Sequence, residues 1–489
     1  MSLNLILFYM VFFPIVGIVL IFFCNSTEKK LLKLVALNFS TGSFICFLIL
    51  WLGFDKSTAK FQFLNKILIS PLFNINLFLG VDGISLFFLF LTTLLIPICI
   101  LSSWSSINFD LKQFLVVFLF LEFLLICVFT VLDVLFFYVF FETILIPMFL
   151  IIGIWGSRER KILAAYYFFL YTLVGSIIML LAIIYVLSQA GTTDYETLLS
   201  FSFTKIEQKL LWFSFFLSFA GKIPMLPVHL WLPEAHVEAP TSGSVILAGV
   251  LLKLGSYGFI RFSLPFFPYA CFFFVPLVYS FITIGVVYTS VTAIRQTDFK
   301  RIIAYTSIAH MNLVVLGIFS FNNSGIEGAI FQSLSHGFVA SGLFLIIGVV
   351  YERYKTRIVK YYSGLAIVMP IYIFIFLFFT VANIAFPGTS SFIGELLIFV
   401  GSFKVNTFIT LFNATSIVIC GGYSLWLFNR IAYGNLKTQY TKKFLDLSLR
   451  ELVCFFPLIT GTLVSGIYPN VFLNSLRFSV SSLIEFMYF

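Results

Sequence analysis

Four charged residues lie inside long apolar stretches of the sequence: Glu142, Lys222, Lys253 and Glu395. A charged side chain at the centre of a membrane helix costs about 2.5–3.5 kcal/mol on insertion scales, so such residues need partners and usually serve a function. Lysine and glutamate both take up and release protons, and burial brings the proton affinities of both side chains toward neutral pH. The four residues are therefore candidate carriers in a proton relay.

Three further residues fit the same chemistry. His310 and His336 fall between Lys253 and Glu395 along the chain, and histidine titrates near neutral pH. Glu122 lies in an earlier apolar stretch. Each of these three residues alone could be a hydrogen-bonded core residue, but beside the four buried charges we interpret them as further members of the relay.

Two of the candidate carriers lie close to a predicted helix break. Lys222 comes two residues before Pro224, and Glu395 follows Pro387 by eight residues. Proline removes a helical hydrogen bond and interrupts the helix. Backbone groups that are freed at membrane depth are tolerated only where they are buried in protein or line a cavity. The breaks therefore predict polar cavities next to titratable side chains.

The elements that position these residues must be membrane helices. The 489 residues are 61% hydrophobic and 10% charged, whereas a soluble domain carries about 25% charged residues. Many apolar runs approach or exceed the ~20 residues that a spanning helix needs. We predict an all-α polytopic membrane protein of about fourteen transmembrane helices, and we expect the first run to be a retained span. The expected spans begin near residues 3, 31, 84, 111, 133, 161, 210, 242, 269, 301, 326, 361, 407 and 450.

Spans seven (Leu210–Val228) and twelve (Tyr361–Lys404) are predicted to be broken. They lie five spans apart, so the segments around them run in opposite directions, which is typical of inverted-topology repeats. The predicted organisation is spans one to three (1–110), a first five-helix repeat (111–265), an inverted second repeat (266–435), and a last span with a tail (436–489). Between spans two and three, we expect an external hairpin or an interfacial segment over Phe61–Gly83.

Lysine and arginine concentrate in the loops that follow odd-numbered spans, notably Arg158–Lys161, Arg353–Lys360 and Arg430–Lys443. Cytoplasmic loops carry the positive excess, so both termini are predicted to lie outside. This bias also accounts for most of the net charge of +9. A nucleic-acid partner is therefore not expected.

The sequence gives no sign of a cofactor or a metal. Its seven cysteines form no C-x-x-C pair, and no G-x-G-x-x-G unit follows a strand. His229, Glu234, His236 and Glu238 are close in sequence, but their spacing matches no usual zinc pattern. We interpret these four residues as loop structure and solvation at the inner mouth of the protein.

The stretch Gly221–Gly255 (GKIPMLPVHLWLPEAHVEAPTSGSVILAGVLLKLG) closely resembles the NADH dehydrogenase (ubiquinone) subunit 4 family of respiratory complex I. Phe137–Gly153, Thr297–Met311 and Phe392–Glu395 support the resemblance, which covers about residues 80–435. It implies a fourteen-helix, antiporter-like subunit in the distal membrane arm. By the same resemblance, a glutamate of the fifth helix (Glu142) pairs with a lysine of the seventh (Lys222).

The resemblance also assigns the other candidates. Lys253 corresponds to the central lysine of the eighth helix, and His310 and His336 to histidines of the helices that follow. Glu395 corresponds to the outlet residue of the broken twelfth helix, which is glutamate in this family and lysine in several sister subunits. The motif Pro233–Pro240 favours this family over Mrp-type cation/proton antiporter subunits, the leading alternative.

The implied function is proton translocation within NADH:ubiquinone oxidoreductase, by a subunit without a redox centre. NAD, FMN, iron–sulfur clusters and ubiquinone would be bound by other subunits. The implied partners are other membrane-arm subunits, including sister antiporter-like subunits, and membrane lipids. The implied location is the mitochondrial inner membrane, with both termini on the intermembrane-space side, or the plasma membrane of a bacterium. A structural spacer that only bridges other subunits is the remaining alternative.

Overall fold

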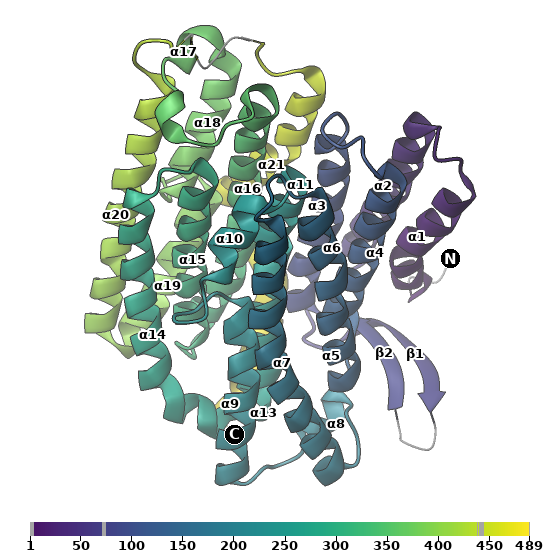
Figure 1. The fold of residues 1–489 in the computed structure, drawn as a ribbon. Coiled ribbons are helices and arrows are strands. Elements are labelled where there is room, and N and C mark those ends of the chain that lie inside the picture. The colour runs from purple at the N-terminus through teal and green to yellow at the C-terminus, as the bar shows by residue number, and fades with distance from the viewer. Residues whose placement is uncertain (1–3, 71–74, 438, 440–444, 489) are drawn as a thin grey trace.

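The structure is a computed structural model that describes residues 4–70, 75–437, 439 and 445–488. In this part of the chain, twelve helices are long and apolar enough to cross a membrane, and Figure 1 shows them packed side by side in one bundle. The prediction of a helical, polytopic membrane protein is confirmed. The twelve are α1 (Asn4–Phe23), α2 (Lys29–Leu52), α3 (Gly83–Ser102), α4 (Leu111–Thr130), α5 with α6 (Val134–Thr143, Leu145–Trp155), α7 (Lys161–Ala190), α11 to α13 (Thr241–Phe266), α14 (Pro268–Arg295), α15 (Phe299–Ile318), α16 (Asn323–Tyr354), α20 (Thr407–Ala432) and α21 (Leu449–Ile467).

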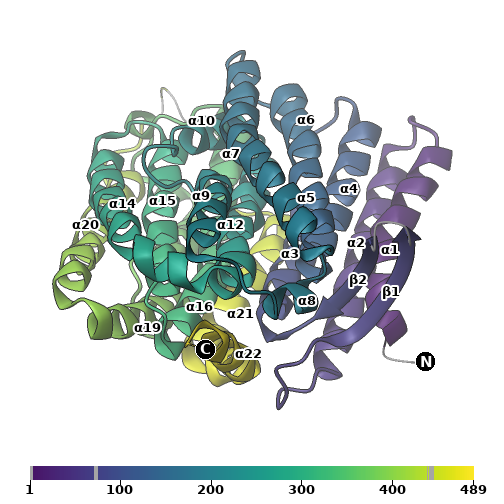
Figure 2. The ribbon, with the colours of Figure 1, turned by 90° about the horizontal axis from the view of Figure 1, so that it is seen from below.

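Within the described ranges, two strands are the exception to the helical architecture. β1 (Gln62–Ser70) and β2 (Ile75–Val81) pair antiparallel. Both views place this hairpin beside α1 and α2 at one side of the bundle (Figures 1 and 2). The paired strands agree with the hairpin that was one of the two alternatives predicted for this segment, and its external position stays a prediction.

The two predicted broken spans each form two shorter helices. α9 (Lys205–Lys222) and α10 (Trp231–Glu238) make up the seventh, and α18 (Pro370–Asn383) and α19 (Ser390–Val405) make up the twelfth. The second break contains Ala385 and Gly388 in left-handed conformations, with φ of 62° and 95°, which a helix cannot continue through. The two breaks thus lie where they were predicted, while the inverted repeat itself stays a prediction.

The twelfth segment begins later than predicted. The sequence placed its start at Tyr361, but the membrane helix α18 starts at Pro370, after the short elements η3 (Val359–Tyr361) and α17 (Leu365–Val368). Gly364 has a φ of 69°, and the residue before a proline is disfavoured in helical conformation. Hydropathy alone does not reveal that the backbone at Gly364 and the residue before Pro370 each interrupt the helix.

Three irregular features were not expected from the sequence. The fifth span is interrupted between α5 and α6, and the eighth contains two π-helical segments, η1 (Leu247–Leu251) and η2 (Phe259–Ser263), around α12 (Leu252–Gly258). The predicted C-terminal tail contains a further helix, α22 (Asn470–Tyr488), which packs against α3 and α16. Gly83 at the start of α3 donates its N–H to Ser479 Oγ at 3.2 Å.

The centre of the bundle is formed by α16 and the eighth helix, which are buried within the chain over most of their length. α19 lies directly on α16, and glycine permits the close approach. A Cβ on Gly328 would lie 2.7 Å from the backbone nitrogen of Ile398 in α19. The lower half of the broken twelfth helix is thus held against the central helix.

Candidate functional site

Glu142 and Lys222 lie near each other where two helices end, with no direct ion pair between them among the described residues. α5 ends at Thr143, one residue after Glu142, and Lys222 is the last residue of α9. Lys222 Nζ lies 4.3 Å from the centre of the Phe141 ring and donates a 3.4 Å hydrogen bond to the Phe141 carbonyl. Since Phe141 directly precedes Glu142, the carboxylate and the ammonium group are close enough to interact electrostatically.

Glu142 is less enclosed than the sequence interpretation assumed. The residue has intermediate exposure in this chain, although its two carboxylate oxygens are covered. Ser176 of α7 is close enough to act on the carboxylate, but no well-aligned hydrogen bond reaches either oxygen among the described residues. A covered carboxylate with so few hydrogen bonds is strongly affected by any charge that approaches it, so Glu142 is well placed to respond to the charge of Lys222.

Lys253 occupies the irregular part of the eighth helix. It lies in α12, between the two π-helical segments, and is fully buried. Its Nζ donates a hydrogen bond to the Ala248 carbonyl of its own helix and lies 2.8 Å from His336 Nδ1 of α16. π-helical turns are frequent at functional sites. Here they flank the lysine that faces the central helix.

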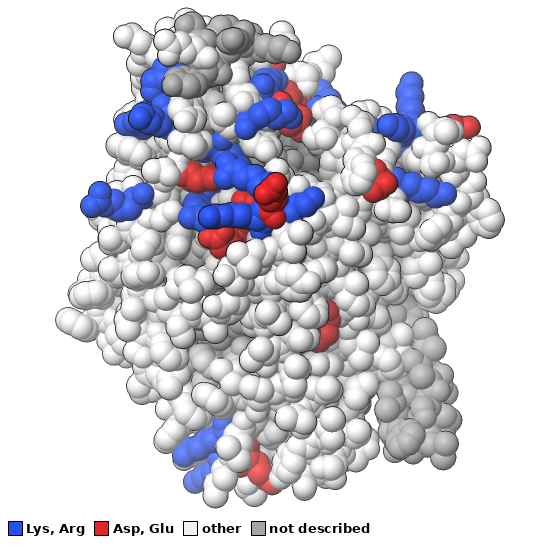
Figure 3. Space-filling model, viewed as in Figure 1, with Lys and Arg blue, Asp and Glu red and all other residues white. Residues whose placement is uncertain are grey.

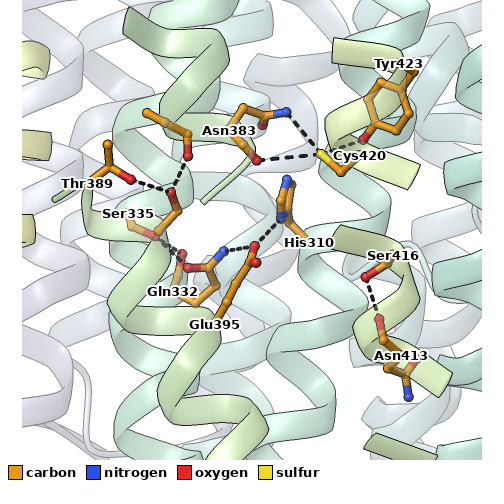
Figure 4. Close-up of polar contacts among 12 residues, drawn as sticks. His310, Gln332, Ser335, Asn383, Thr389, Glu395, Asn413, Ser416, Cys420 and Tyr423 are labelled. Atoms are coloured by element: carbon orange, nitrogen blue, oxygen red, sulfur yellow. Dashed lines mark hydrogen bonds and ion pairs between the residues drawn. The ribbon is translucent and has the colours of Figure 1, made fainter. Parts of the chain in front are cut away.

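The two histidines continue from Lys253 toward α19. The ring centroids of His336 and His310 are 5.8 Å apart, and His310 Nδ1 lies 2.9 Å from Glu395 Oε1. Figure 4 shows His310 and Glu395 pointing at each other from α15 and α19. The structure therefore brings Lys253, His336, His310 and Glu395 together in one series, in an order that the sequence left open.

Glu122 is the candidate that the structure places apart. It is fully buried in α4 and accepts a hydrogen bond from Ser43 Oγ of α2. Among the described residues, no hydrogen bond or ion pair joins it to the other six candidates. The site thus has three parts: the Glu142–Lys222 pair, the series from Lys253 to Glu395, and the separate Glu122.

A buried ion pair was missed by the sequence reading. Arg261, two turns after Lys253 in the eighth helix, donates to Asp82 Oδ1 at 2.5 Å, and both side chains are buried. Arg261 Nε also donates to the Tyr257 hydroxyl at 3.3 Å. The sequence did indicate that Arg261 has a buried partner, because an arginine inside an apolar run is costly without one. It did not indicate which residue, because Asp82 is 179 residues away in sequence.

The interpretation of His236 and its neighbours as solvated loop residues is partly wrong. The segment is the helix α10, and His236 is fully buried, with its ring stacked on Phe344 at 4.7 Å. Glu234 pairs with Arg301, and Glu238 Oε2 lies 3.8 Å from an Arg357 nitrogen. Packing accounts for His236 and ion pairing for Glu238, whereas Glu234 is paired but still 32% exposed and borders an open hollow, so the solvation interpretation holds for Glu234.

Basic loops gather at one end of the bundle. Arg357 donates to Ser157 Oγ at 2.9 Å, and Lys437 donates to the Lys360 carbonyl at 2.6 Å, so the three loops predicted to lie inside meet in space. Figure 3 shows lysine and arginine over this upper region, mixed with acidic residues around an open hollow. The residues of the third loop at 438 and 440–444 lie outside the described part.

Comparison with known sequences gives a consistent match. The family model described as "NADH:quinone oxidoreductase/Mrp antiporter, TM" matches residues 131–420. Proteins named NADH-ubiquinone oxidoreductase chain 4 are 54% identical in Arabidopsis thaliana and 55% identical in Chondrus crispus. Each match covers 96% of this chain and at least 95% of the relative. The protein of the same name from Metridium senile is 46% identical, with 96% of each chain covered.

A solved structure is also similar. It is titled "Respiratory complex I from Thermus thermophilus with bound NADH", and the matching chain is 27% identical. The TM-score is 0.88, and the match covers 98% of this chain and 99% of that one. The similarity therefore extends over the whole fold, including the terminal regions that the sequence resemblance did not cover.

Proposed function

Because this chain belongs to the family of NADH-ubiquinone oxidoreductase chain 4, we propose that it translocates protons in the membrane arm of complex I. The chain supplies no redox chemistry in this proposal. NADH oxidation and quinone reduction take place in other subunits, which bind NAD, FMN, iron–sulfur clusters and ubiquinone. Electron transfer is coupled to this chain through its charged residues.

The observation that carries the proposal is the series of contacts from Lys253 through His336 and His310 to Glu395. Its first and last contacts are 2.8 and 2.9 Å long, which is hydrogen-bonding distance. The two imidazole rings lie side by side between these contacts. Each of these four titratable groups costs free energy to bury, and packing alone does not need any of them. Their close spacing across four different helices therefore indicates a function.

A proton can move along this series in three steps. Protonated Lys253 donates to His336 Nδ1, the proton passes from the His336 ring to the His310 ring, and protonated His310 transfers it to Glu395. Each imidazole can accept on one nitrogen and release from the other. The ring-to-ring step spans the longest gap, so a rotation of one ring or a bridging water must complete it.

Glu142 and Lys222 act as the control pair of the relay in this proposal. An anion beside a buried lysine favours the protonated lysine, and its removal favours proton release. The interruption between α5 and α6 lies directly after Glu142, so a small backbone change there would move the carboxylate relative to Lys222. Glu122 remains a candidate without a described link to this pair.

The proposed membrane and partner subunits follow from the family, and the proposed orientation follows from the distribution of lysine and arginine among the loops. We place the chain in the mitochondrial inner membrane, in contact with sister antiporter-like subunits, other membrane-arm subunits and lipids. Both termini would face the intermembrane space. The meeting of the Arg158–Lys161, Arg353–Lys360 and Arg430–Lys443 loops at one end of the bundle supports this orientation, because positive loops stay on the inner side.

The experiment that tests the proposed function is Lys253→Met in the assembled complex. Methionine keeps the length and apolar stem of lysine but cannot carry a proton. We expect proton pumping in proteoliposomes to be lost, while NADH oxidation with an artificial electron acceptor is unchanged. Lys56→Met, at an exposed lysine, is the matched control and should pump normally.

Near-normal pumping by Lys253→Met would contradict the relay. It would support the view that this chain is a structural spacer in the arm. The family model covers both NADH:quinone oxidoreductase and Mrp antiporter proteins, so ion specificity is a second readout. Sodium-dependent transport in the absence of NADH-oxidising subunits would support the antiporter alternative.

A further inference from the structure

Gln332 touches the last carrier of the series. It lies in α16, is buried, and donates from Nε2 to Glu395 Oε1 at 3.1 Å. His310 Nδ1 lies 2.9 Å from the same carboxylate oxygen. Figure 4 shows Gln332 and His310 approaching Glu395 from two sides. One oxygen of the carboxylate is therefore shared by a titratable partner and by a neutral amide.

The orientation of the Gln332 amide is set by the Glu395 carboxylate. A reversed amide would place its oxygen against the carboxylate, and two acceptors repel each other, so the NH₂ group is directed at Glu395. Ser335 Oγ lies 2.9 Å from Gln332 Oε1 and 3.0 Å from the Gln332 carbonyl oxygen. Its one hydroxyl proton can be donated to either oxygen, so the serine is compatible with this orientation.

Backbone packing holds the two helices at this point. A Cβ on Gly394 would lie 2.5 Å from Gln332 Oε1 and 2.8 Å from Gln332 Cα, so α19 approaches α16 at the residue directly before Glu395. His336 follows Gln332 by four residues on α16, which places both on one face of the helix. The same helix face thus contacts Lys253 through His336 and Glu395 through Gln332.

Glu395 has an alternative direction in which to turn. Its side chain borders a small cavity that His310, Asn383, Cys420 and Tyr423 also line. The titratable groups that face Glu395 are His310 from α15 and Cys420 and Tyr423 from α20. A glutamate side chain has several rotamers of similar energy, so a partner is needed to keep this one directed at His310.

We propose that Gln332 is a positioning residue of the relay, whose amide holds the Glu395 carboxylate against His310 throughout the transfer. When His310 gives up its proton, its attraction for the carboxylate weakens. The Gln332 N–H remains a donor in every protonation state of the site, because an amide does not titrate in this range. The inference rests on the proposed function, since it assigns Gln332 a role through Glu395.

The test is a double-mutant cycle in the assembled complex, with proton pumping as the readout. Gln332→Leu removes the donor at similar size and should slow pumping about tenfold, the size expected for one hydrogen bond to a charged group. In a Glu395→Asp background, which keeps a titratable carboxylate on a shorter stem, the same change should have an effect of less than about twofold, because this carboxylate no longer reaches the Gln332 amide. Gln332→Asn retains the amide and should recover part of the lost rate.

Ser333→Ala is the matched control, because the only hydrogen bond that its hydroxyl makes to the described residues is to the Ala329 carbonyl of its own helix. It should leave pumping unchanged. Equal losses from Gln332→Leu in both backgrounds, or no rescue by Gln332→Asn, would overturn the positioning role and leave the relay standing. Normal pumping by Glu395→Gln would instead contradict Glu395 as a carrier, and the proposed role of Gln332 would fail with it.

Discussion

Lys253 and His336 face each other across the two central helices, with Nζ of the lysine 2.8 Å from Nδ1 of the histidine. The lysine also donates to the carbonyl of Ala248. A protonated lysine has only donors, so His336 Nδ1 must be the acceptor when Lys253 is charged, and its hydrogen then lies on Nε2. The charge state of the lysine thus selects the tautomer of the histidine.

His336→Gln should stop proton transfer while preserving a polar contact with Lys253. Glutamine can hydrogen-bond to the lysine, but it cannot accept and release a proton at neutral pH. We expect pumping to be lost and quinone reduction to lose its coupling, as measured by protons moved per NADH oxidised in proteoliposomes. A variant that pumps at more than about half the native rate would show that His336 is only a hydrogen-bonding residue.

Glu142→Gln should weaken the control of Lys222. The substitution keeps the shape of the side chain and removes the charge that acts on the lysine. We expect pumping and coupled quinone reduction to fall severalfold, with Glu142→Asp intermediate because it retains a carboxylate on a shorter stem. The comparison of these two variants at equal amounts of assembled complex separates charge from packing, and equal rates would argue against an electrostatic role.

Arg261→Met should destabilise the subunit strongly. Removal of one partner from a buried ion pair costs about 3–5 kcal/mol, because the other charge remains buried without compensation. Asp82 would be that charge here. The double variant Asp82→Asn with Arg261→Met should therefore be more stable than Arg261→Met alone. The amount of intact complex after heating, followed by native electrophoresis, measures the difference, and a double variant that is worse than the single one would contradict this account.

Gly255→Ala should disturb the contact between α12 and α9. A Cβ at this position would lie 2.6 Å from Ile223 Cγ1 and 2.8 Å from the Phe219 carbonyl oxygen. Overpacking of this kind typically costs about 1–3 kcal/mol. In contrast, Gly422→Ala in α20 meets nothing within 4 Å and should be neutral or slightly stabilising, since alanine favours a helix. Thermal stability of the assembled complex is the measurement, and equal stability of the two variants would be the opposing result.

Features encoded locally in the sequence were predictable. The apolar runs identified the spans, and Pro224 and Pro387 marked the two breaks, because hydropathy and proline act through short segments of chain. The π-helical segments around Lys253 were not predictable, since no proline or glycine pattern sets them apart from an ordinary helix. They depend on packing against neighbouring helices.

The candidate site was predictable only in part. Titratable residues at membrane depth stand out by type, so Lys253, His336, His310 and Glu395 could be selected from the sequence. Their order in space could not, because it depends on contacts between helices far apart along the chain. Gln332 was missed for a related reason: a glutamine in a helix carries no charge, and only its contact with Glu395 makes it notable.

The position of Phe141 has a mechanical consequence. Its ring and carbonyl contact Lys222, and the next residue along the backbone is Glu142. The aromatic ring and the carboxylate therefore belong to neighbouring residues at the end of α5, joined by a single peptide bond. Any displacement of that helix end would change the Phe141 contacts of the lysine and move the carboxylate at the same time, without a chain of intermediate residues.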